Sequence, residues 1–140
     1  MKKTNFIGAV VCAAMFMLSS CCQEGRINGT KIKEGNNLVG VITDSETGKG
    51  IAGVAVSDGY TFTTTDKNGV YQFAGNPLTR VVYYTTPAEY EVNLDEQTKQ
   101  PLFYKHCKFN PDTLNRNDFS LTPMDKVEED LTLIVISDPQ

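Results

Sequence analysis

The side chain with the clearest potential for chemistry lies close to the C-terminal end of the chain. Asp138 follows residues 131–136 (LTLIVI), a run that is apolar except for Thr132. A strand that is apolar at successive positions is typical of a sheet covered on both faces, and α/β proteins place functional side chains at the carboxyl ends of such strands. The residues alone leave two interpretations open: Asp138 is a metal ligand, or residues 137–139 form a turn.

Two other segments carry metal-binding residue types, but their spacing favours structural roles. His106 and Cys107 are adjacent, and the chain has no second histidine and no C-x-x-C motif to complete a zinc site. We expect a packed or exposed pair on a strand. Residues 66–69 (DKNG) look like the start of a calcium loop. An EF-hand needs glycine at its sixth position and an acid at its twelfth, where this chain has Tyr71 and Pro77, so we expect a turn.

The start of the chain has the order of regions found in exported proteins. Lys2 and Lys3 precede residues 6–18, which are apolar apart from Gly8. These thirteen residues have the length of a signal-peptide core. They are too short to cross a hydrocarbon layer of roughly 30 Å, which needs about 20 helical residues. Residues 1–20 are therefore predicted to be a signal peptide.

The next residues, Leu18-Ser19-Ser20-Cys21, resemble the lipobox of bacterial lipoproteins. The resemblance implies that the Cys21 thiol takes a diacylglyceryl group and that cleavage makes Cys21 the N-terminal residue. Cys22 fits less well, because Ser19 would then occupy the bulky aliphatic position. The alternative is an ordinary secretory signal in which Cys21 is incidental. Because two or three acyl chains anchor stably, we expect a cell-envelope protein that is lipid-anchored to a membrane, the outer membrane being the expected one.

Composition excludes several classes of partner and scaffold. The chain has a formal charge of −4, and removal of residues 1–20 leaves eleven basic against seventeen acidic residues. No basic stripe is present, so nucleic acid is not an expected partner. Cys12 leaves with the signal peptide and Cys21 carries the lipid, so the four cysteines do not indicate a disulfide framework.

The mature chain divides into a polar segment and a region of short strands. Residues 21–37 are polar, contain three glycines and lack an apolar period, which predicts a flexible tether. Residues 38–124 alternate β-prone runs with turns and have no helical period. They predict an all-β domain, an antiparallel β-sandwich of about seven strands. The predicted strands are 38–43, 54–57, 60–65 (half-buried), 70–73, 80–85 (central), 102–106 and 118–122, with polar loops at 95–100 and 110–117.

Residues 38–73 resemble the carboxypeptidase regulatory-like, or transthyretin-like, β-sandwich. The matching residues are Val39-Gly40-Val41, Asp44, Thr47-Gly48, Ile51-Ala52-Gly53-Val54, Val56, Thr65-Asp66, Asn68-Gly69 and Tyr71. The resemblance implies positive φ angles at Gly48 and Gly69, local backbone hydrogen bonds to Asp66 and Asn68, and core positions for Val54, Val56 and Tyr71. It implies a fold rather than a function, because this fold serves as a spacer or adaptor in many exported proteins.

The sandwich, its leader and the final residues LTLIVISDPQ together resemble the N-terminal part of calcineurin-like metallophosphoesterases. In that family the first strand of the catalytic sheet ends in an aspartate that binds one of two divalent metal ions, which hold the phosphoester and generate hydroxide. The resemblance implies that Asp138 is this ligand. Gln140 stands where the family's D-x-H pattern has histidine, and its amide oxygen is a weaker ligand than imidazole.

The resemblance also implies that residues 125–140 are a linker and the first strand of a catalytic domain whose remaining motifs lie downstream. The chain alone is therefore expected to hold no cofactor and to catalyse no reaction, while its full-length parent is expected to bind two divalent metal ions. The leading hypothesis is an accessory domain that positions this phosphoesterase domain.

Two rival hypotheses come from other functional classes. The first is a stand-alone envelope module that binds glycan or protein through Tyr60, Tyr83, Tyr84 and Tyr90, although strand core and cross-strand pairs explain these tyrosines more simply. The second is the N-terminal extension of an outer-membrane receptor, which would continue into a plug domain.

Overall fold

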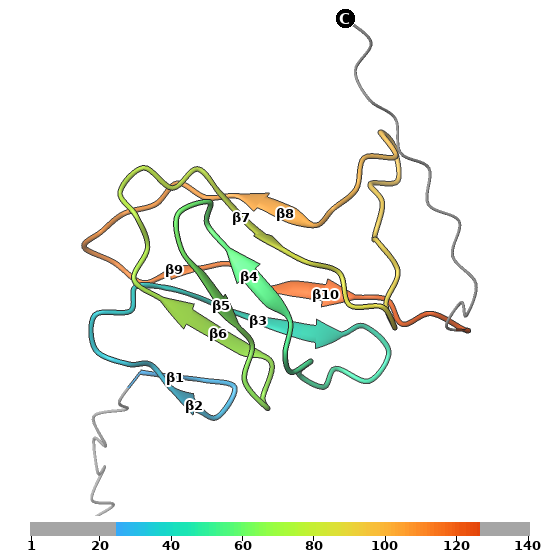
Figure 1. The fold of residues 1–140 in the computed structure, drawn as a ribbon, viewed down its shortest axis with the longest axis horizontal. Coiled ribbons are helices and arrows are strands. Elements are labelled where there is room, and N and C mark those ends of the chain that lie inside the picture. The colour runs from blue at the N-terminus through green and yellow to red at the C-terminus, as the bar shows by residue number, and fades with distance from the viewer. Residues whose placement is uncertain (1–24, 127–140) are drawn as a thin grey trace, which may run out of the picture.

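The computed structural model describes residues 25–126, in which every regular element is a β-strand (Figure 1). The strands are β1 (Arg26–Ile27), β2 (Thr30–Lys31), β3 (Leu38–Asp44), β4 (Ala55–Ser57), β5 (Phe62–Thr64), β6 (Val70–Phe73), β7 (Val81–Tyr84), β8 (Tyr104–His106), β9 (Asn115–Arg116) and β10 (Phe119–Leu121). All seven predicted strands are present, as β3 to β8 and β10. The predicted strand at 131–136 lies outside the described residues.

Two four-stranded sheets form the sandwich. One has the order β10-β3-β6, with β9 also paired to β3, and the other has the order β5-β4-β7-β8. The fold is therefore the predicted β-sandwich, and β7 is an interior strand as expected. Most pairs are antiparallel, but β9 and β10 run parallel to β3. A parallel neighbour requires a crossover connection, and here the chain crosses from β8 in the other sheet before it returns beside β3.

The main core lies between the two sheets. Its buried side chains are Leu38, Ile42, Val54, Val56, Tyr71, Phe73, Val82, Tyr84, Cys107, Phe119 and Leu121. The rings of Tyr84 and Phe119 meet edge to face, with 4.9 Å between their centroids. The predicted core positions Val54, Val56 and Tyr71 are confirmed, because all three side chains are buried there. Val54 and Val56 are two residues apart and therefore share a face.

A second apolar cluster corrects the prediction that residues 21–37 are a flexible tether. Val39, Val41 and Val70 face away from the main core, and Ile27 is buried against them. Ile27 belongs to the hairpin formed by β1 and β2. The outer face of the β3–β6 pair is apolar, so it requires a cover, and the hairpin provides it. Residues 26–37 therefore belong to the folded body, whereas the sequence pattern assigns them to the tether.

The predicted strand at 60–65 has one face that is more buried, but this face carries Thr63 and Thr65 while the aromatic side chains lie outside. Thr63 lies opposite the buried Val56 in the register of β4 and β5, so Phe62 and Thr64 fall on the outer face. Phe62 is 80% exposed. The predicted loop at 110–117 also differs, because Asn115 and Arg116 form β9. The positive φ angles expected at Gly48 and Gly69 are confirmed, at 69° and 75°.

Candidate functional site

The residues predicted to carry chemistry lie at the two ends of the chain. Cys21, Asp138 and Gln140 all fall outside the described residues. The structure describes the β-sandwich that would position these residues. It includes the hairpin through which the chain enters the sandwich and the segment through which the chain leaves it. In Figure 1 these two places lie toward opposite ends of the long axis.

The N-terminal hairpin is fixed to the turn that follows β5. Asn28 donates from Nδ2 to the carbonyl oxygen of Asn68 at 2.6 Å. Thr30 donates from Oγ1 to Asp66 Oδ2 at 2.5 Å and accepts a hydrogen bond from Asn68 Nδ2 at 3.0 Å. Together with the burial of Ile27, these bonds hold the hairpin in one place on the sheet.

The residues that look like a calcium loop form a turn, as predicted. Asp66 Oδ1 accepts the backbone N–H groups of Asn68 and Val70, at 2.8 and 3.0 Å. Burial raises the pKa of the Asp66 carboxyl, but the hydrogen bonds from Thr30, Val70 and Asn68 outweigh it and hold the pKa below its usual range. The expected local bond of Asn68 is not formed by its side chain, which bonds Thr30 on the hairpin instead.

The sequence contains a signal for this hairpin. Asn-Gly between two short β-prone segments is the strongest two-residue hairpin signal, and here it is Asn28-Gly29. Both residues have positive φ angles, 45° and 82°, as the tight turn requires. The polar composition of residues 21–37 obscured it.

The chain leaves the sandwich beside residues 89–94, which join the two sheets. Glu91 N–H donates to the Thr122 carbonyl and Met124 N–H donates to the Glu89 carbonyl, both at 2.9 Å. On the other side of the same segment, Leu102 N–H donates to the Asn93 carbonyl at 2.7 Å. Residues 89–94 therefore lie between the continuation of β10 and the residues that lead into β8. Local patterning gave no signal for this segment.

Asp58 is a buried carboxylate that sequence reasoning missed. Its Oδ1 accepts the N–H groups of Tyr60 and Thr61, at 3.0 and 2.8 Å. Its Oδ2 accepts the Thr79 hydroxyl at 2.7 Å and the Asn76 N–H at 3.2 Å. Burial raises the pKa of Asp58, and these bonds outweigh it, so the pKa lies below its usual range. With both carboxylate oxygens hydrogen-bonded, Asp58 holds the turn at 58–61 against the loop at 76–79 and has a structural role.

The side chains of His106 and Cys107 lie in different environments. Cys107 is buried in the main core, and its sulfur accepts a hydrogen bond from Asn117 Nδ2 at 3.7 Å. His106 is exposed, and its ring meets Tyr104 edge to face at 5.7 Å. Within residues 25–126 no group of three or more His, Cys, Asp or Glu side chains could hold a metal ion. The same stretch also has no helix of the length and hydropathy needed to cross a membrane.

The four tyrosines of the binding-module hypothesis do not form one surface. Tyr84 is in the core, and the Tyr90 hydroxyl donates to Asp44 Oδ2 at 3.2 Å. Tyr60 is exposed. Tyr83 lines a shallow hollow of about 320 Å³ on the outer face of the β5-β4-β7-β8 sheet, together with Phe62.

A comparison with protein families matches most of the described chain. The family described as the N-terminal part of calcineurin-like phosphoesterase matches residues 27–124. The match begins inside the hairpin and ends at the segment where the chain leaves the sandwich, so it includes the elements at both ends. A comparison with curated proteins gives no match. The family implies metal dependence in the full-length protein. The chain belongs to the family of N-terminal domains of calcineurin-like phosphoesterases.

Proposed function

We propose that this chain is the membrane-tethered accessory domain of a lipoprotein phosphoesterase. Cys21 carries the lipid, the β-sandwich spaces and orients the catalytic domain, and that domain begins with residues 131–136. Asp138 is the first metal ligand, while Gln140 is at most a weak one. The family match over residues 27–124 carries the proposal, and the lipobox-like Leu18-Ser19-Ser20-Cys21 supports the tether.

The positions of the two chain ends support a spacer role. Only four residues separate Cys21 from Arg26 in β1, so the two Cα atoms lie five steps and at most about 18 Å apart. A lipid on Cys21 would therefore hold the hairpin near the membrane surface. The other end of the described chain lies toward the far end of the long axis (Figure 1), so the catalytic domain would be held away from the lipid.

Phosphoester hydrolysis tests the assignment of the catalytic domain. Residues 21–140 should not hydrolyse a generic phosphodiester with Mn²⁺, and the same chain extended through its downstream sequence should do so. Asp138→Ala in the extended protein should reduce both metal binding and turnover. Turnover by purified residues 21–140 that survives repurification would contradict the proposal, as would downstream DNA that encodes no phosphoesterase motifs.

Labelling with a lipid precursor tests the anchor, and the adjacent cysteine provides a matched control. The label should disappear in Cys21→Ser and persist in Cys22→Ser. The reverse result would move the anchor to Cys22. Absence of the label from the wild-type chain would remove the lipoprotein assignment and leave the family assignment unaffected.

A stand-alone envelope module remains the alternative function, and one observation favours it. The outer-face hollow exposes Phe62, and exposed aromatic side chains are common in binding surfaces. In this alternative, residues 21–140 alone bind an envelope glycan or protein, and Phe62→Ala weakens the binding. A stop codon directly after residue 140, with a soluble folded product, would favour this function over the first.

A further inference from the structure

An apolar surface lies beside the point where the chain leaves the sandwich. Leu94 and Pro101 pair across an antiparallel bridge, and the same register places Val92 opposite Phe103. Residues two apart share a face, so these four side chains gather on one side of the two segments. All four are exposed. We define Val92, Leu94, Pro101 and Phe103 as the exit patch.

The backbone under the exit patch is held on two sides. Phe103 accepts a hydrogen bond from Tyr84 N–H at 3.0 Å, which joins this region to β7. Asn93 lies between Val92 and Leu94, and its side chain bonds β10 and the residue that follows it. Its Nδ2 donates to the Ser120 carbonyl at 2.6 Å, and its Oδ1 accepts a hydrogen bond from the Thr122 hydroxyl at 2.9 Å. These bonds fix the backbone that carries the patch, and they place the Asn93 side chain on the side of β10.

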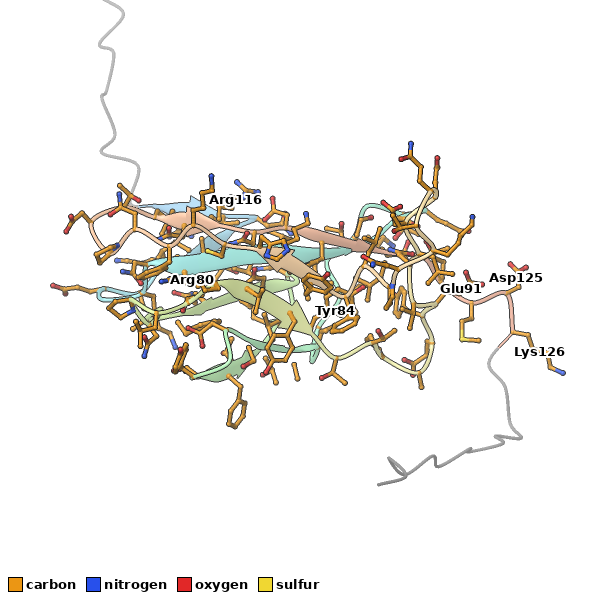
Figure 2. All side chains as sticks on the ribbon, turned by 90° about the horizontal axis from the view of Figure 1, so that it is seen from above. Arg80, Tyr84, Glu91, Arg116, Asp125 and Lys126 are labelled. Atoms are coloured by element: carbon orange, nitrogen blue, oxygen red, sulfur yellow. The ribbon has the colours of Figure 1, made fainter. Side chains whose placement is uncertain are left out.

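The distance to the next segment of the chain limits what can cover the exit patch. Glu91, which adjoins the patch, lies at the same end of the molecule as Asp125 and Lys126, while Arg80 and Arg116 lie in the other half (Figure 2). From Lys126, five residues lead to Leu131, a reach of at most about 18 Å. A domain that begins at Leu131 must therefore start close to this end of the sandwich.

We infer that the exit patch is the docking surface for the downstream phosphoesterase domain of the same chain. This inference rests on the proposed function, because that domain is its occupant. Docking buries Val92, Leu94 and Phe103, and burial of apolar surface favours the contact. With a linker this short, the docked domain has a fixed orientation relative to the hairpin near the membrane.

Cysteine labelling can test the docking with a matched pair of leucines. Leu94 is 53% exposed and Leu114 is 51% exposed. Leu114 belongs to the loop between β8 and β9, and that loop lies at the opposite end of the sandwich (Figure 1). Leu94→Cys and Leu114→Cys are each made in a Cys22→Ser background, in the 140-residue chain and in the chain extended through its downstream domain. Cys107 is buried and remains in place. The measurement is the rate of maleimide labelling.

In the extended protein, the labelling rate of Leu94→Cys should be lower than in the 140-residue chain by a factor of about ten or more. The reason is that a buried thiol reacts only after local opening. Leu114→Cys should react equally fast in both. Val92→Cys should behave like Leu94→Cys and serves if that variant does not fold. Equal rates at Leu94 in both proteins would overturn the docking, as would equal slowing at Leu114. Concentration-dependent protection in the 140-residue chain would assign the patch to a second copy instead.

Phosphodiester hydrolysis by the same preparation separates the two failures. An extended protein without hydrolysis contradicts the proposed function itself. An extended protein that hydrolyses substrate but leaves Leu94→Cys fully reactive contradicts only the docking.

Discussion

The hydroxyl of Tyr71 donates a hydrogen bond to the carbonyl oxygen of Asn117, 46 residues further along the chain. Tyr71 lies on β6, and Asn117 lies between β9 and β10, so the bond connects the strands that pair with the two edges of β3. The N–H of Asn117 also donates to the Val39 carbonyl at 2.9 Å. Burial raises the pKa of the Tyr71 phenol, with smaller contributions from Asp118 and Cys107. The phenol therefore remains a donor throughout the neutral range.

Tyr71→Phe should lower the free energy of unfolding by about 1–3 kcal/mol, because the ring remains while the Asn117 carbonyl loses a buried partner. Urea denaturation at neutral pH measures the change. Tyr60→Phe, at an exposed position, is the control and should stay within about 0.5 kcal/mol of wild type. Equal effects of the two substitutions would show that the Tyr71 bond contributes nothing specific.

Gly40→Ala should destabilise the fold by about 3 kcal/mol, the upper part of the range for overpacking. A Cβ atom on Gly40 would lie 1.9 Å from the Asn117 oxygen and 2.6 Å from the Tyr71 ring. Neither group can move away without breaking the bond between them. Gly25→Ala is the control, because nothing lies within 4 Å of its Cβ position. Thermal unfolding distinguishes the two, and a Gly40→Ala protein as stable as wild type would refute this close packing.

Two turns with the same hydrogen-bond pattern carry different residues at one equivalent position. Substitutions at that position should therefore have opposite effects on the stability of the protein in the two turns. Asp44 Oδ1 accepts the N–H and hydroxyl of Thr47 at 2.8 and 2.9 Å, and Asp95 Oδ1 accepts those of Thr98 at 2.7 and 2.9 Å. The next residue is Gly48 in the first turn, with φ 69°, and Lys99 in the second, with φ 56°.

Lys99→Gly should raise the free energy of unfolding by up to about 1 kcal/mol, because a side chain in the left-handed region is strained. Gly48→Lys should lower it by a similar amount for the same reason. Thermal denaturation of both variants provides the comparison. Changes of the same sign in both turns would show that the left-handed strain does not control these positions.

Stability at low pH should depend on Asp58. Its pKa in the folded state lies below its usual range, so its stabilisation is complete above the unfolded pKa, about 3.9. That stabilisation disappears as the pH falls through the lower, folded pKa. Asp58→Asn should cost about 1–3 kcal/mol at pH 7, since an amide cannot accept on both sides.

The difference between wild type and Asp58→Asn should then shrink as the pH falls below about 4. Urea denaturation at pH 7 and at pH 3 measures it, with Asp112→Asn, at an exposed position, as the control. A difference that stays constant over this range would show that the Asp58 charge is not what stabilises the two loops.

The sequence by itself determined the β-class of this protein, its seven main strands and the family of its sandwich. Alternation in residues such as Val54 and Val56 shows which face of a strand is buried, and Gly69 marks a turn that few other residues can adopt. These signals extend over two to four residues, so they are readable without knowledge of the fold. The roles of Cys21, Asp138 and Gln140 are also inferred from local motifs, and they stay predictions.

Only the tertiary structure decided which strands are neighbours and what covers each face. The parallel pairing of β10 with β3, the hairpin over Val39 and Val41, and the segment at 89–94 that joins the sheets all depend on contacts between distant residues. The exposure of Phe62 has the same origin, because it follows from the register with β4. A local pattern states that a face is apolar, but its partner is set by how the whole chain crosses and closes, which no short window of sequence contains.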